Sequence, residues 1–400
     1  MRKIIKKIVT KFFNKFLLQK FNKIASNYEK MGKIFKNITF FVPLDKKMVF
    51  FESHMGKQYS CMPRAISEYL IENSDYKIIW CFNRPENYQS IKGVKIIKRL
   101  SPQYYYYLAR SKYFVLNQPL PRFIKKKYNQ IFLQTWHGTP LKKIGGDVHY
   151  EDIEKVKAVT HNWNYLISQN SYSTEILKRA FFFKKEVIEE GYPKNDRFLK
   201  WDKTKIHEIK KSLKIPFDKK IILYAPTWRD DSRNDFKLQL DLKDIKTKIG
   251  NDWVIILRLH SVLSSKLTSK DIDNQNVFDY SSYDFGEELM AISDVMITDY
   301  SSIMFDYSVL TKPIIFYAYD LTDYGDKLRG MYLDYHETVP GPVVQNQSDL
   351  ISEIKNLSSY WNRYKDKYTN FRAKFVYKDD GESTDRVVNR VFKKRNGKWK

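Results

Sequence analysis

The 400-residue sequence has two cysteines and no long apolar run in its first 40 residues. Cys61 and Cys81 are too few for a disulfide framework or a four-thiolate zinc site, and they are not in a CxxC spacing. Near the N-terminus, lysines at 11, 15, 20 and 23 interrupt every apolar run. A signal peptide needs an apolar stretch of about 7–15 residues and a spanning helix about 20. We therefore expect a cytoplasmic protein that does not cross a membrane.

Several motifs of nucleotide and metal chemistry are also missing. The sequence contains no GxxxxGK[ST], no GxGxxG after a strand, no HExxH and no Cys/His metal spacing. Asp230 and Asp231 are adjacent carboxylates after an arginine, a pattern more typical of a solvated turn than of a cation site. We therefore predict an active site without a metal ion or a cofactor, which relies on histidine, arginine and the donors of a helix terminus.

Acidic residues are scarce relative to basic ones, with 46 Asp and Glu against 71 Lys and Arg and a net charge of +25. This excess predicts an anionic partner, which can be nucleic acid, an acidic membrane leaflet or a phosphate-rich substrate. Residues 1–40 alone hold eleven Lys or Arg and a single acid, Glu29. Their apolar residues recur at spacings of one, three and four, which predicts a helix with one apolar stripe between lysines.

We interpret residues 1–45 as a basic amphipathic segment that lies on an anionic membrane surface. The alternative is an amphipathic helix packed on the protein's own core with its lysines in solvent. A nucleic-acid arm is disfavoured, because phenylalanine-rich faces suit lipid better than a phosphate backbone. We therefore expect a membrane surface as a partner and no nucleic acid.

After residue 45 short apolar runs alternate with helical stretches, which is typical of α/β proteins with parallel sheets. Two such series follow one another, separated by a charged helix at 203–213. The predicted strands are 48–52, 77–82, 94–97, 114–117, 131–135, 165–168 and 187–189 in the first series, and 221–225, 254–259, 277–279, 295–298 and 313–317 in the second. We expect two doubly wound domains, 46–202 and 203–375, and a helical tail, 376–400, with polar helices from Asp349 onward packed back across them.

Polar clusters follow five of the predicted strands, where ligands of open α/β sheets bind. They are Trp136–Pro140, Gly191–Arg197, Tyr224–Asp230, Arg258–Ser261 and Thr298–Ser302, the last running into Asp306. Two domains in tandem bring the carboxyl ends of two sheets to one cleft. We therefore expect the five clusters to converge there.

Each cluster has a chemical and a structural interpretation. His137 can act as a general base, since imidazole titrates near working pH, but a lone histidine is often only a hydrogen-bonding group. Arg258 and His260 share one face of a strand and can present donors to an anion. Ser301 and Ser302 stand at a predicted helix start, which favours a phosphate site or a simple N-cap. The convergence of the five clusters favours the chemical interpretation.

Together these motifs strongly resemble the CDP-glycerol glycerophosphotransferases that prime and polymerise wall teichoic acid. The motifs are WHGTPLKKIG at 136–145, GYPKND at 191–196, APTWR at 225–229, RLH at 258–260 and TDYSSIMFD at 298–306. The resemblance covers about residues 48–375. It implies a GT-B architecture, in which two Rossmann-like parallel-sheet domains face each other across a cleft, with a membrane-associated basic amphipathic helix. The first domain would hold the acceptor and the second the CDP donor.

The resemblance implies that His137 and His260 are catalytic, with His137 deprotonating the acceptor hydroxyl. It implies substrate binding by Trp136, Gly138, Thr139, Pro140, Lys194, Pro226, Thr227, Arg258, Leu259, Ser301, Ser302 and Asp306. Trp136 to Pro140 would line the site of attack, and Arg258 with His260 would clamp the pyrophosphate. Pro226 and Thr227 would face the nucleotide, the two serines would hold phosphate oxygens, and Asp306 would accept hydrogen bonds from the donor. At position 194 the family commonly has arginine, and this sequence has lysine. Lysine keeps the positive charge but lacks the two-pronged guanidinium that binds a phosphate through two hydrogen bonds.

The implied reaction is one in-line displacement at the phosphorus that bears the polyol, without a covalent enzyme intermediate. The donor would be CDP-glycerol or CDP-ribitol, and CMP would leave with its charge stabilised by Arg258, His260 and the helix terminus. The acceptor would be a polyprenyl-diphosphate-linked saccharide, or a growing chain, at the cytoplasmic face of the cell membrane.

Three alternatives stay open at this point. The first is the same chemistry with CDP-ribitol, or in a capsule polymerase. The second is a GT-B glycosyltransferase that releases a nucleoside diphosphate, and the third is a non-catalytic nucleic-acid or membrane-binding protein, which leaves the five motifs unexplained. About 45 residues precede the first predicted domain, which favours a primase or short-extension enzyme over a long-chain polymerase.

Overall fold

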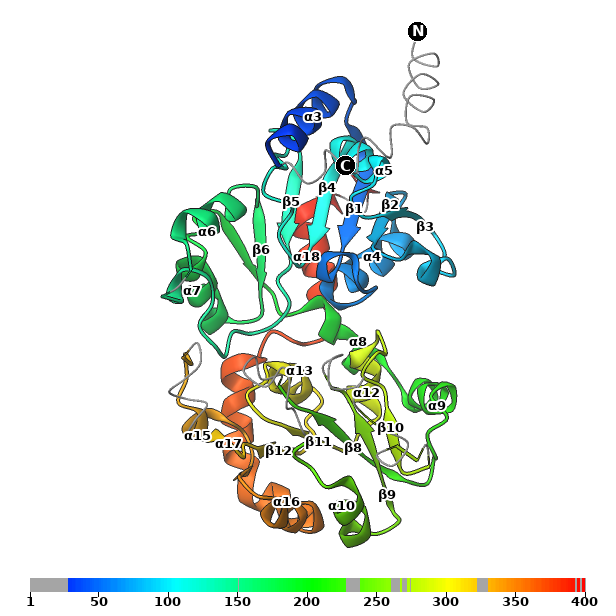
Figure 1. Cartoon of the computed structure of the whole chain (residues 1–400), viewed down its shortest axis with the longest axis vertical. Coiled ribbons are helices and arrows are strands. Elements are labelled where there is room, and N and C mark those ends of the chain that lie inside the picture. Colours follow the sequence, from blue (N-terminus) through cyan, green and yellow to red (C-terminus); the bar gives the residue numbers. More distant parts are fainter. Residues whose placement is uncertain are drawn as a thin grey trace.

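The structure is a computed structural model of the chain. It describes residues 28–149, 151–227, 238–259, 267, 272–273, 275–321, 330–392, 394–395 and 398–399. Two parallel sheets form two α/β domains, placed one above the other in Figure 1. The predicted fold class of two parallel-sheet α/β domains is confirmed.

The N-terminal domain contains a seven-stranded parallel sheet with strand order β3-β2-β1-β4-β5-β6-β7. Its strands are β1 (Asp45–Glu52), β2 (Lys77–Phe82), β3 (Val94–Lys98), β4 (Ser111–Leu116), β5 (Ile131–Gln134), β6 (Tyr165–Ser168) and β7 (Glu186–Glu189). Helices cover both faces of such a sheet. The sequences of its strands are therefore apolar at nearly every position. The strand order reverses between β1 and β4, so the loops after these strands flank a topological switch point.

Helices cover both faces of this sheet. They are α4 (Cys61–Asn73), α5 (Pro102–Arg110), α6 (Ile153–Thr160) and α7 (Ser171–Ala180), with α3 (Tyr28–Phe41) packed on α5. Two separate apolar clusters result, one under α5 with Phe50 and Phe114 and one under α4 with Phe51 and Trp80.

The C-terminal domain repeats the plan with a six-stranded parallel sheet of order β10-β9-β8-β11-β12-β13. The strands are β8 (Lys220–Ala225), β9 (Trp253–Leu257), β10 (Val277–Asp279), β11 (Val295–Thr298), β12 (Ile314–Tyr317) and β13 (Val343–Val344). The helices are α8 (Asp196–Lys200), α9 (Lys203–Ser212), α10 (Leu242–Ile249), α12 (Gly286–Ile292), α13 (Ile303–Ser308), α15 (Tyr335–Thr338), α16 (Gln347–Lys355) and α17 (Tyr360–Phe375). The switch point of this sheet lies between β8 and β11.

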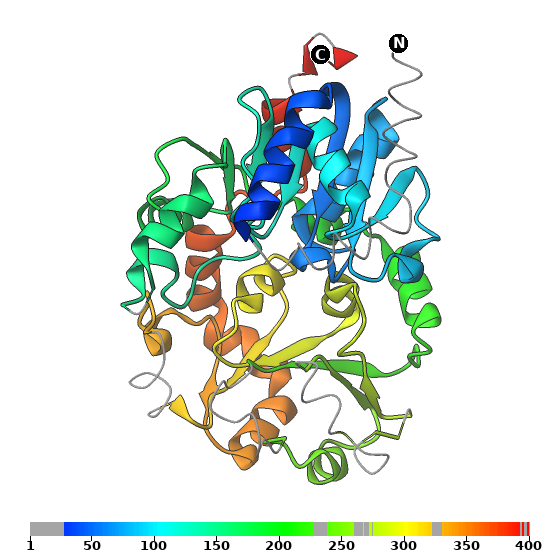
Figure 2. The same ribbon diagram turned by 45° about the horizontal axis from the view of Figure 1, so that its top comes forward.

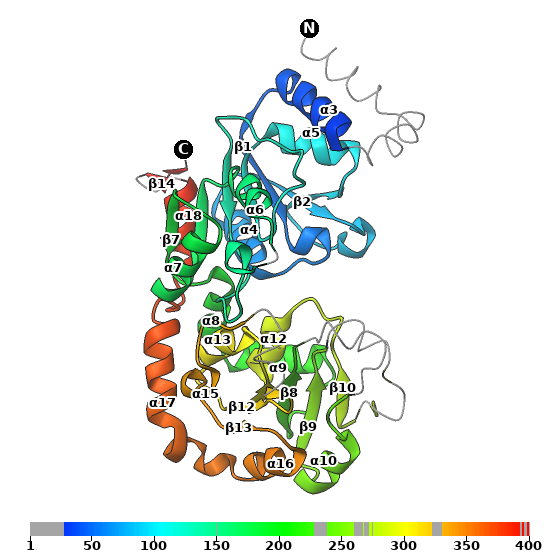
Figure 3. The same cartoon turned by 60° about the vertical axis from the view of Figure 1, so that its left-hand side comes forward.

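The C-terminal helices tie the two domains together, as the sequence predicted. Phe371 and Phe375 of α17 pack in the core of the C-terminal domain. The chain then returns, and α18 (Ser383–Phe392) buries Val388 and Val391 among the strands of the N-terminal sheet. Figure 3 shows α17 beside the lower domain and α18 against the upper one. A short antiparallel pair, β14 (Lys394–Arg395) and β15 (Lys398–Trp399), follows α18.

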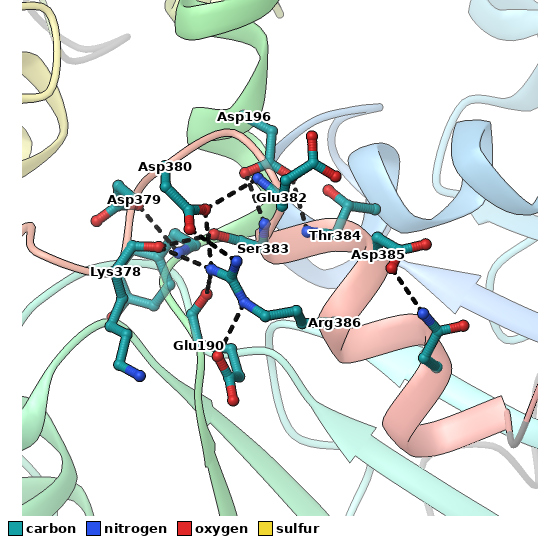
Figure 4. A network of polar contacts seen from close by, with 12 residues as sticks. Glu190, Asp196, Lys378, Asp379, Asp380, Glu382, Ser383, Thr384, Asp385 and Arg386 are labelled. Atoms are coloured by element: carbon teal, nitrogen blue, oxygen red, sulfur yellow. Dashed lines mark hydrogen bonds and ion pairs between the residues drawn. The ribbon is translucent and has the colours of Figure 1, made fainter.

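Buried carboxylates fix the point where the chain returns (Figure 4). Asp196 accepts hydrogen bonds from the backbone N–H groups of Ser383 and Thr384, at 3.1 and 2.7 Å, and so satisfies the first turn of α18. Arg386 forms an ion pair with Asp380 at 2.8 Å. Gly191 has a positive φ of 79°, and a Cβ there would lie 2.6 Å from the carbonyl oxygen of Lys378. Part of the Gly191–Arg197 motif therefore stabilises the segment in which the chain returns from the C-terminal domain to the N-terminal domain.

Of the basic N-terminal segment, the structure describes only the part from Tyr28 onward. In α3, Phe35 is buried under α5 and its ring lies 6.1 Å from that of Tyr105. This described part packs on the protein's own core, whereas the apolar stripe that predicted a membrane-binding helix lies before it, so the membrane-binding helix stays a prediction. Residues 1–27 lie outside the described residues. Among those that are described, no helix has both the length and the apolar character needed to span a bilayer.

Candidate active site

The two domains meet at the carboxyl ends of their sheets. Gly138 follows β5, and a Cβ at this position would lie 3.2 Å from the hydroxyl of Ser302 at the start of α13. A Cβ here would force the Ser302 hydroxyl to move by a few tenths of an ångström, so a glycine lets the two segments approach closely. The structure thus brings two of the predicted clusters, one from each domain, into direct proximity.

Trp136 has an unusual backbone conformation, which sets the direction of the chain at the next residue, His137. The φ of Trp136 is 57°, in the left-handed region that a residue with a bulky side chain rarely adopts. Two contacts hold it there: its N–H donates to the side-chain oxygen of Gln134 at 3.0 Å, and its ring packs edge-on against Phe181 at 4.9 Å. Strained residues of this kind cluster at functional sites. Trp136 therefore acts on the site mainly through the placement of His137.

His137 is held between three backbone and side-chain groups. Its Nδ1 lies 3.4 Å from the carbonyl oxygen of Asn117, in the loop after β4. Its own carbonyl accepts a hydrogen bond of 3.1 Å from the Lys194 ammonium. The ring centroid of His54, which follows β1, lies 6.2 Å away. The two loops at the switch point of the sheet thus meet at His137.

Both histidines are neutral near pH 7. Burial lowers the pKa of His137 to about 4, and the neighbouring His54 and Lys194 lower it further than the Asn117 carbonyl raises it. Burial, followed by Lys194, also lowers the pKa of His54 to about 4. With the Nδ1 proton of His137 on the Asn117 carbonyl, its Nε2 carries the lone pair that a general base needs.

This shift makes a testable prediction about pH dependence. Protonation removes the base, so activity falls as pH drops through the pKa of the folded enzyme. We expect kcat/KM, which reports the free enzyme, to stay level from about pH 8 to about pH 5 and to fall with a midpoint near pH 4. A steady-state pH profile of CMP release checks it. A midpoint at the ordinary histidine value of 6.5 would show that burial does not set the titration of the base.

His54 is a site residue that the sequence analysis missed. Its N–H donates to the side-chain oxygen of Asn117 at 2.8 Å, and the Asn117 amide in turn donates to the Ser53 hydroxyl at 3.1 Å. His54 and Met55 both have positive φ, 45° and 55°, so this strand end is also strained. The signal was present in the sequence, because Ser53-His54 follows a predicted strand just as Trp136-His137 does.

Lys194 and Asp306 were both predicted to bind substrate, and in this structure they bind each other. The Lys194 ammonium and an Asp306 carboxylate oxygen lie 2.7 Å apart, and both side chains are more than 90% buried. Burial by itself lowers the pKa of Lys194. The attraction and hydrogen bond of Asp306, together with Cys61 and Glu287, outweigh burial, and the net shift of the pKa is upward. Lys194 comes from the N-terminal domain and Asp306 from α13. The pair therefore joins the domains directly behind His137.

Arg258 follows β9, and backbone carbonyls hold its guanidinium. Its Nη1 donates to the carbonyls of Tyr280, at 3.0 Å, and Tyr283. Its Nε and Nη2 groups donate no hydrogen bond to any described residue. They are therefore available for the predicted contact with an anionic oxygen of the substrate. Leu259 was predicted to bind substrate, but its side chain is 6% exposed and packs in a core cluster of the C-terminal domain. His260, the second predicted catalytic residue, lies outside the described residues.

Thr139 and Pro140 are buried below His137. The Thr139 hydroxyl donates to Gln169, and the Pro140 carbonyl accepts a 2.8 Å hydrogen bond from Tyr172. They support the loop of His137, and their side-chain contacts are with the protein. This differs from the predicted substrate-lining role, because the chain turns inward directly after Gly138.

The remaining predicted residues stand at the switch point of the second sheet. Pro226 and Thr227 follow β8, and Ser301 and Ser302 follow β11, all partly exposed. The Ser301 hydroxyl lies 3.4 Å from the N–H of Ile303, whereas Ser302 at the N-cap of α13 makes no side-chain cap bond. The described residues contain no group of three or more His, Cys, Asp or Glu side chains that could hold a metal ion, and Asp230 and Asp231 lie outside them.

Known proteins share these features. The sequence is 42% identical over 401 residues to the teichoic acid poly(glycerol phosphate) polymerase of Bacillus subtilis, a match that covers 95% of this chain and 54% of that protein. It is 39% identical over 371 residues to the teichoic acid glycerol-phosphate transferase of Staphylococcus aureus, covering 87% of this chain and 94% of that protein. The chain thus spans about half the length of the first relative and nearly all of the second.

The structure of the wall teichoic acid polymerase TagF superimposes with a TM-score of 0.85 at 35% identity, covering 92% of this chain and 94% of that one. A structure of a TagF point variant soaked with CDPG has the same TM-score. Residues 34–393 match the family described as CDP-glycerol:poly(glycerophosphate) glycerophosphotransferase. The chain therefore belongs to the CDP-glycerol:poly(glycerophosphate) glycerophosphotransferase family.

Proposed function

We propose that this protein transfers glycerol phosphate from CDP-glycerol to a hydroxyl group of a lipid-linked teichoic acid precursor and releases CMP. The observation that carries the proposal is the neutral, partly buried His137 at the junction of the two sheets, where Gly138 faces Ser302. Family membership and the CDPG-soaked TagF structure support the same donor.

The mechanism follows from the placement of these groups. Nε2 of His137 takes the proton of the acceptor hydroxyl, whose oxygen attacks the phosphorus that bears glycerol. The bond from this phosphorus to the CMP oxygen breaks in line, and CMP leaves with the electron pair. Arg258, through its Nε and Nη2 groups, and the hydroxyls of Ser301 and Ser302 face the second-sheet side of the site and stabilise the charge that develops on the leaving phosphate.

The donor is tested by supplying CDP-glycerol, CDP-ribitol and a UDP-sugar in parallel and by separating the released nucleotides chromatographically. We expect acceptor-dependent CMP from CDP-glycerol, at least about tenfold less CMP from CDP-ribitol, whose longer polyol must fit a site shaped for glycerol, and no UDP from the UDP-sugar. Faster CMP release from CDP-ribitol than from CDP-glycerol would show that the transferred group is ribitol phosphate and would contradict the proposed donor. Release of UDP would contradict it in favour of a glycosyltransferase.

The acceptor is a saccharide on a polyprenyl diphosphate carrier at the cytoplasmic face of the membrane, where we place the protein peripherally. The basic residues 1–40, with +10 of the +25 net charge, support attachment to anionic lipid. Co-sedimentation with anionic vesicles, and its loss at high salt, checks the location. For product length we keep the prediction of one or a few added units, and a ladder of dozens on a gel would identify a long-chain polymerase instead.

A further inference from the structure

A large groove lies on the N-terminal domain, apart from His137. It has a volume of about 1640 Å³ and opens between α3 and the chain that connects β4 to β5. Its lining combines accessible apolar side chains, among them Met55, Leu100, Phe123 and Val159, with seven lysines and arginines and no acidic residue. An apolar floor with basic sides fits a ligand that has an apolar chain and an anionic group.

Four of these basic side chains have no carboxylate partner among the described residues: Lys33, Lys36, Arg122 and Lys125. By contrast, Arg99 pairs with Glu52 at 3.2 Å, and Lys126 donates to the carbonyl oxygen of Gln130 at 2.9 Å. Unpaired cations around an apolar floor favour an anionic ligand.

One end of the groove carries exposed aromatic side chains. Phe40 and Phe41, at the end of α3, are 84% and 78% exposed, and Tyr128 in the facing loop is fully exposed. The Lys127 ammonium bonds the carbonyl oxygen of Val42 at 2.5 Å, which holds these two segments together. Aromatic residues beside lysines are typical of a surface that enters the headgroup region of a bilayer. Figures 1 and 2 place α3 on the side of the N-terminal domain away from the C-terminal domain.

The groove also extends toward the catalytic histidines. Met55 lines it, and the preceding residue, His54, has its ring centroid 6.2 Å from that of His137. Pro119 and Leu120 line it as well, shortly after Asn117, whose carbonyl oxygen contacts His137. A ligand in the groove would therefore reach from the aromatic end toward the site of transfer.

We propose that this groove binds a single lipid whose long apolar chain carries a diphosphate. The chain lies on the apolar floor, and the diphosphate contacts Lys36, Arg122 and Lys125. That the groove binds such a lipid is independent of the proposed function. That this lipid is the carrier of the acceptor rests on the proposed function.

Binding is measured by calorimetry on the full chain with farnesyl diphosphate as a soluble probe, beside inorganic pyrophosphate and farnesol. We expect farnesyl diphosphate to bind at least about tenfold more tightly than either half, because the groove offers both kinds of contact. Equal affinity for pyrophosphate, or displacement of the probe by CDP-glycerol, would place the probe in the donor site and overturn the proposal.

Charge reversal locates the site. K36E and K125E each change one exposed lysine of the groove, and we expect about tenfold weaker binding of the probe in each. The matched control is K243E, an exposed lysine on α10 at the far end of the C-terminal domain, which should leave binding unchanged. If the two groove variants bind the probe like the wild type and lose only vesicle binding, the lysines serve the bilayer surface and the proposal fails.

A kinetic comparison separates this proposal from the proposed function. In K36E and K125E we expect a raised KM for the lipid-linked acceptor and unchanged turnover of a soluble acceptor that lacks both the prenyl chain and the diphosphate. Equal loss on both acceptors would overturn the groove proposal. Absence of CMP release in the wild type with either acceptor would contradict the proposed function, while the calorimetry would still decide the groove.

Discussion

Replacing His137 by alanine should lower the rate of acceptor-dependent CMP release by about 10²–10⁴-fold, the contribution that general bases typically make. The reason is specific to this site, where the neutral imidazole has its Nδ1 on the Asn117 carbonyl and the next residue, Gly138, faces the start of α13. The fold should survive, because the ring is only partly buried and its backbone bond to Lys194 uses the carbonyl oxygen, which alanine retains.

Turnover and thermal stability measured on the same preparation check this prediction. His161→Ala is the matched control, since His161 is exposed at the end of α6 and should be silent in both measurements. Near-normal turnover in His137→Ala would remove this residue from the mechanism. The family resemblance extends the same expectation to His260→Ala, which loses turnover by a similar factor if it contacts the leaving phosphate.

The second large effect concerns the buried ion pair between the domains. Lys194→Met leaves the Asp306 carboxylate buried without its cation, a change that typically costs about 3–5 kcal/mol of unfolding free energy. It also removes the hydrogen bond to the carbonyl oxygen of His137, so we expect turnover to fall as well. Chemical denaturation gives the first quantity and CMP release the second.

A double variant separates the two effects. Lys194→Met with Asp306→Leu replaces the pair by apolar side chains, which is often nearly neutral for stability. We expect most of the stability to return while turnover stays low, because the His137 carbonyl still lacks its donor. As a control, Lys205→Met breaks an exposed pair with Glu208 and should cost about 1 kcal/mol or less. Unchanged stability in Lys194→Met alone would contradict the structural role of the pair.

The sequence predicted most strands because strands of a covered parallel sheet are apolar along their whole length. β2 (Lys77–Phe82) and β10 (Val277–Asp279) were predicted to the residue for this reason. β13 was missed, because two residues, Val343 and Val344, are too short to form a recognisable apolar run. The same patterns predicted the return of the chain across the domains, since α18 combines apolar residues on one face with charges on the other.

The site was predicted less completely, because tertiary contacts decide which side chains face it. The family resemblance predicted Lys194 and Asp306 as substrate-binding residues, but only the meeting of two domains shows that they pair with each other. Leu259 lies between two predicted site residues, and the alternation of side chains along a strand turns it into the core. The predicted membrane-binding stripe lies within residues 1–27, outside the described residues, and stays a prediction.

The most direct test of the central claim is a pair of reactions containing the protein, CDP-glycerol and a synthetic lipid-linked disaccharide, one without and one with EDTA. The account predicts acceptor-dependent CMP at the same rate in both, with each CMP matched by one glycerol phosphate unit on the lipid. If CMP forms without glycerol phosphate appearing on the lipid, the reaction is not the proposed transfer. If EDTA abolishes CMP release, the transfer depends on a metal ion and is not the metal-independent reaction with His137 as base.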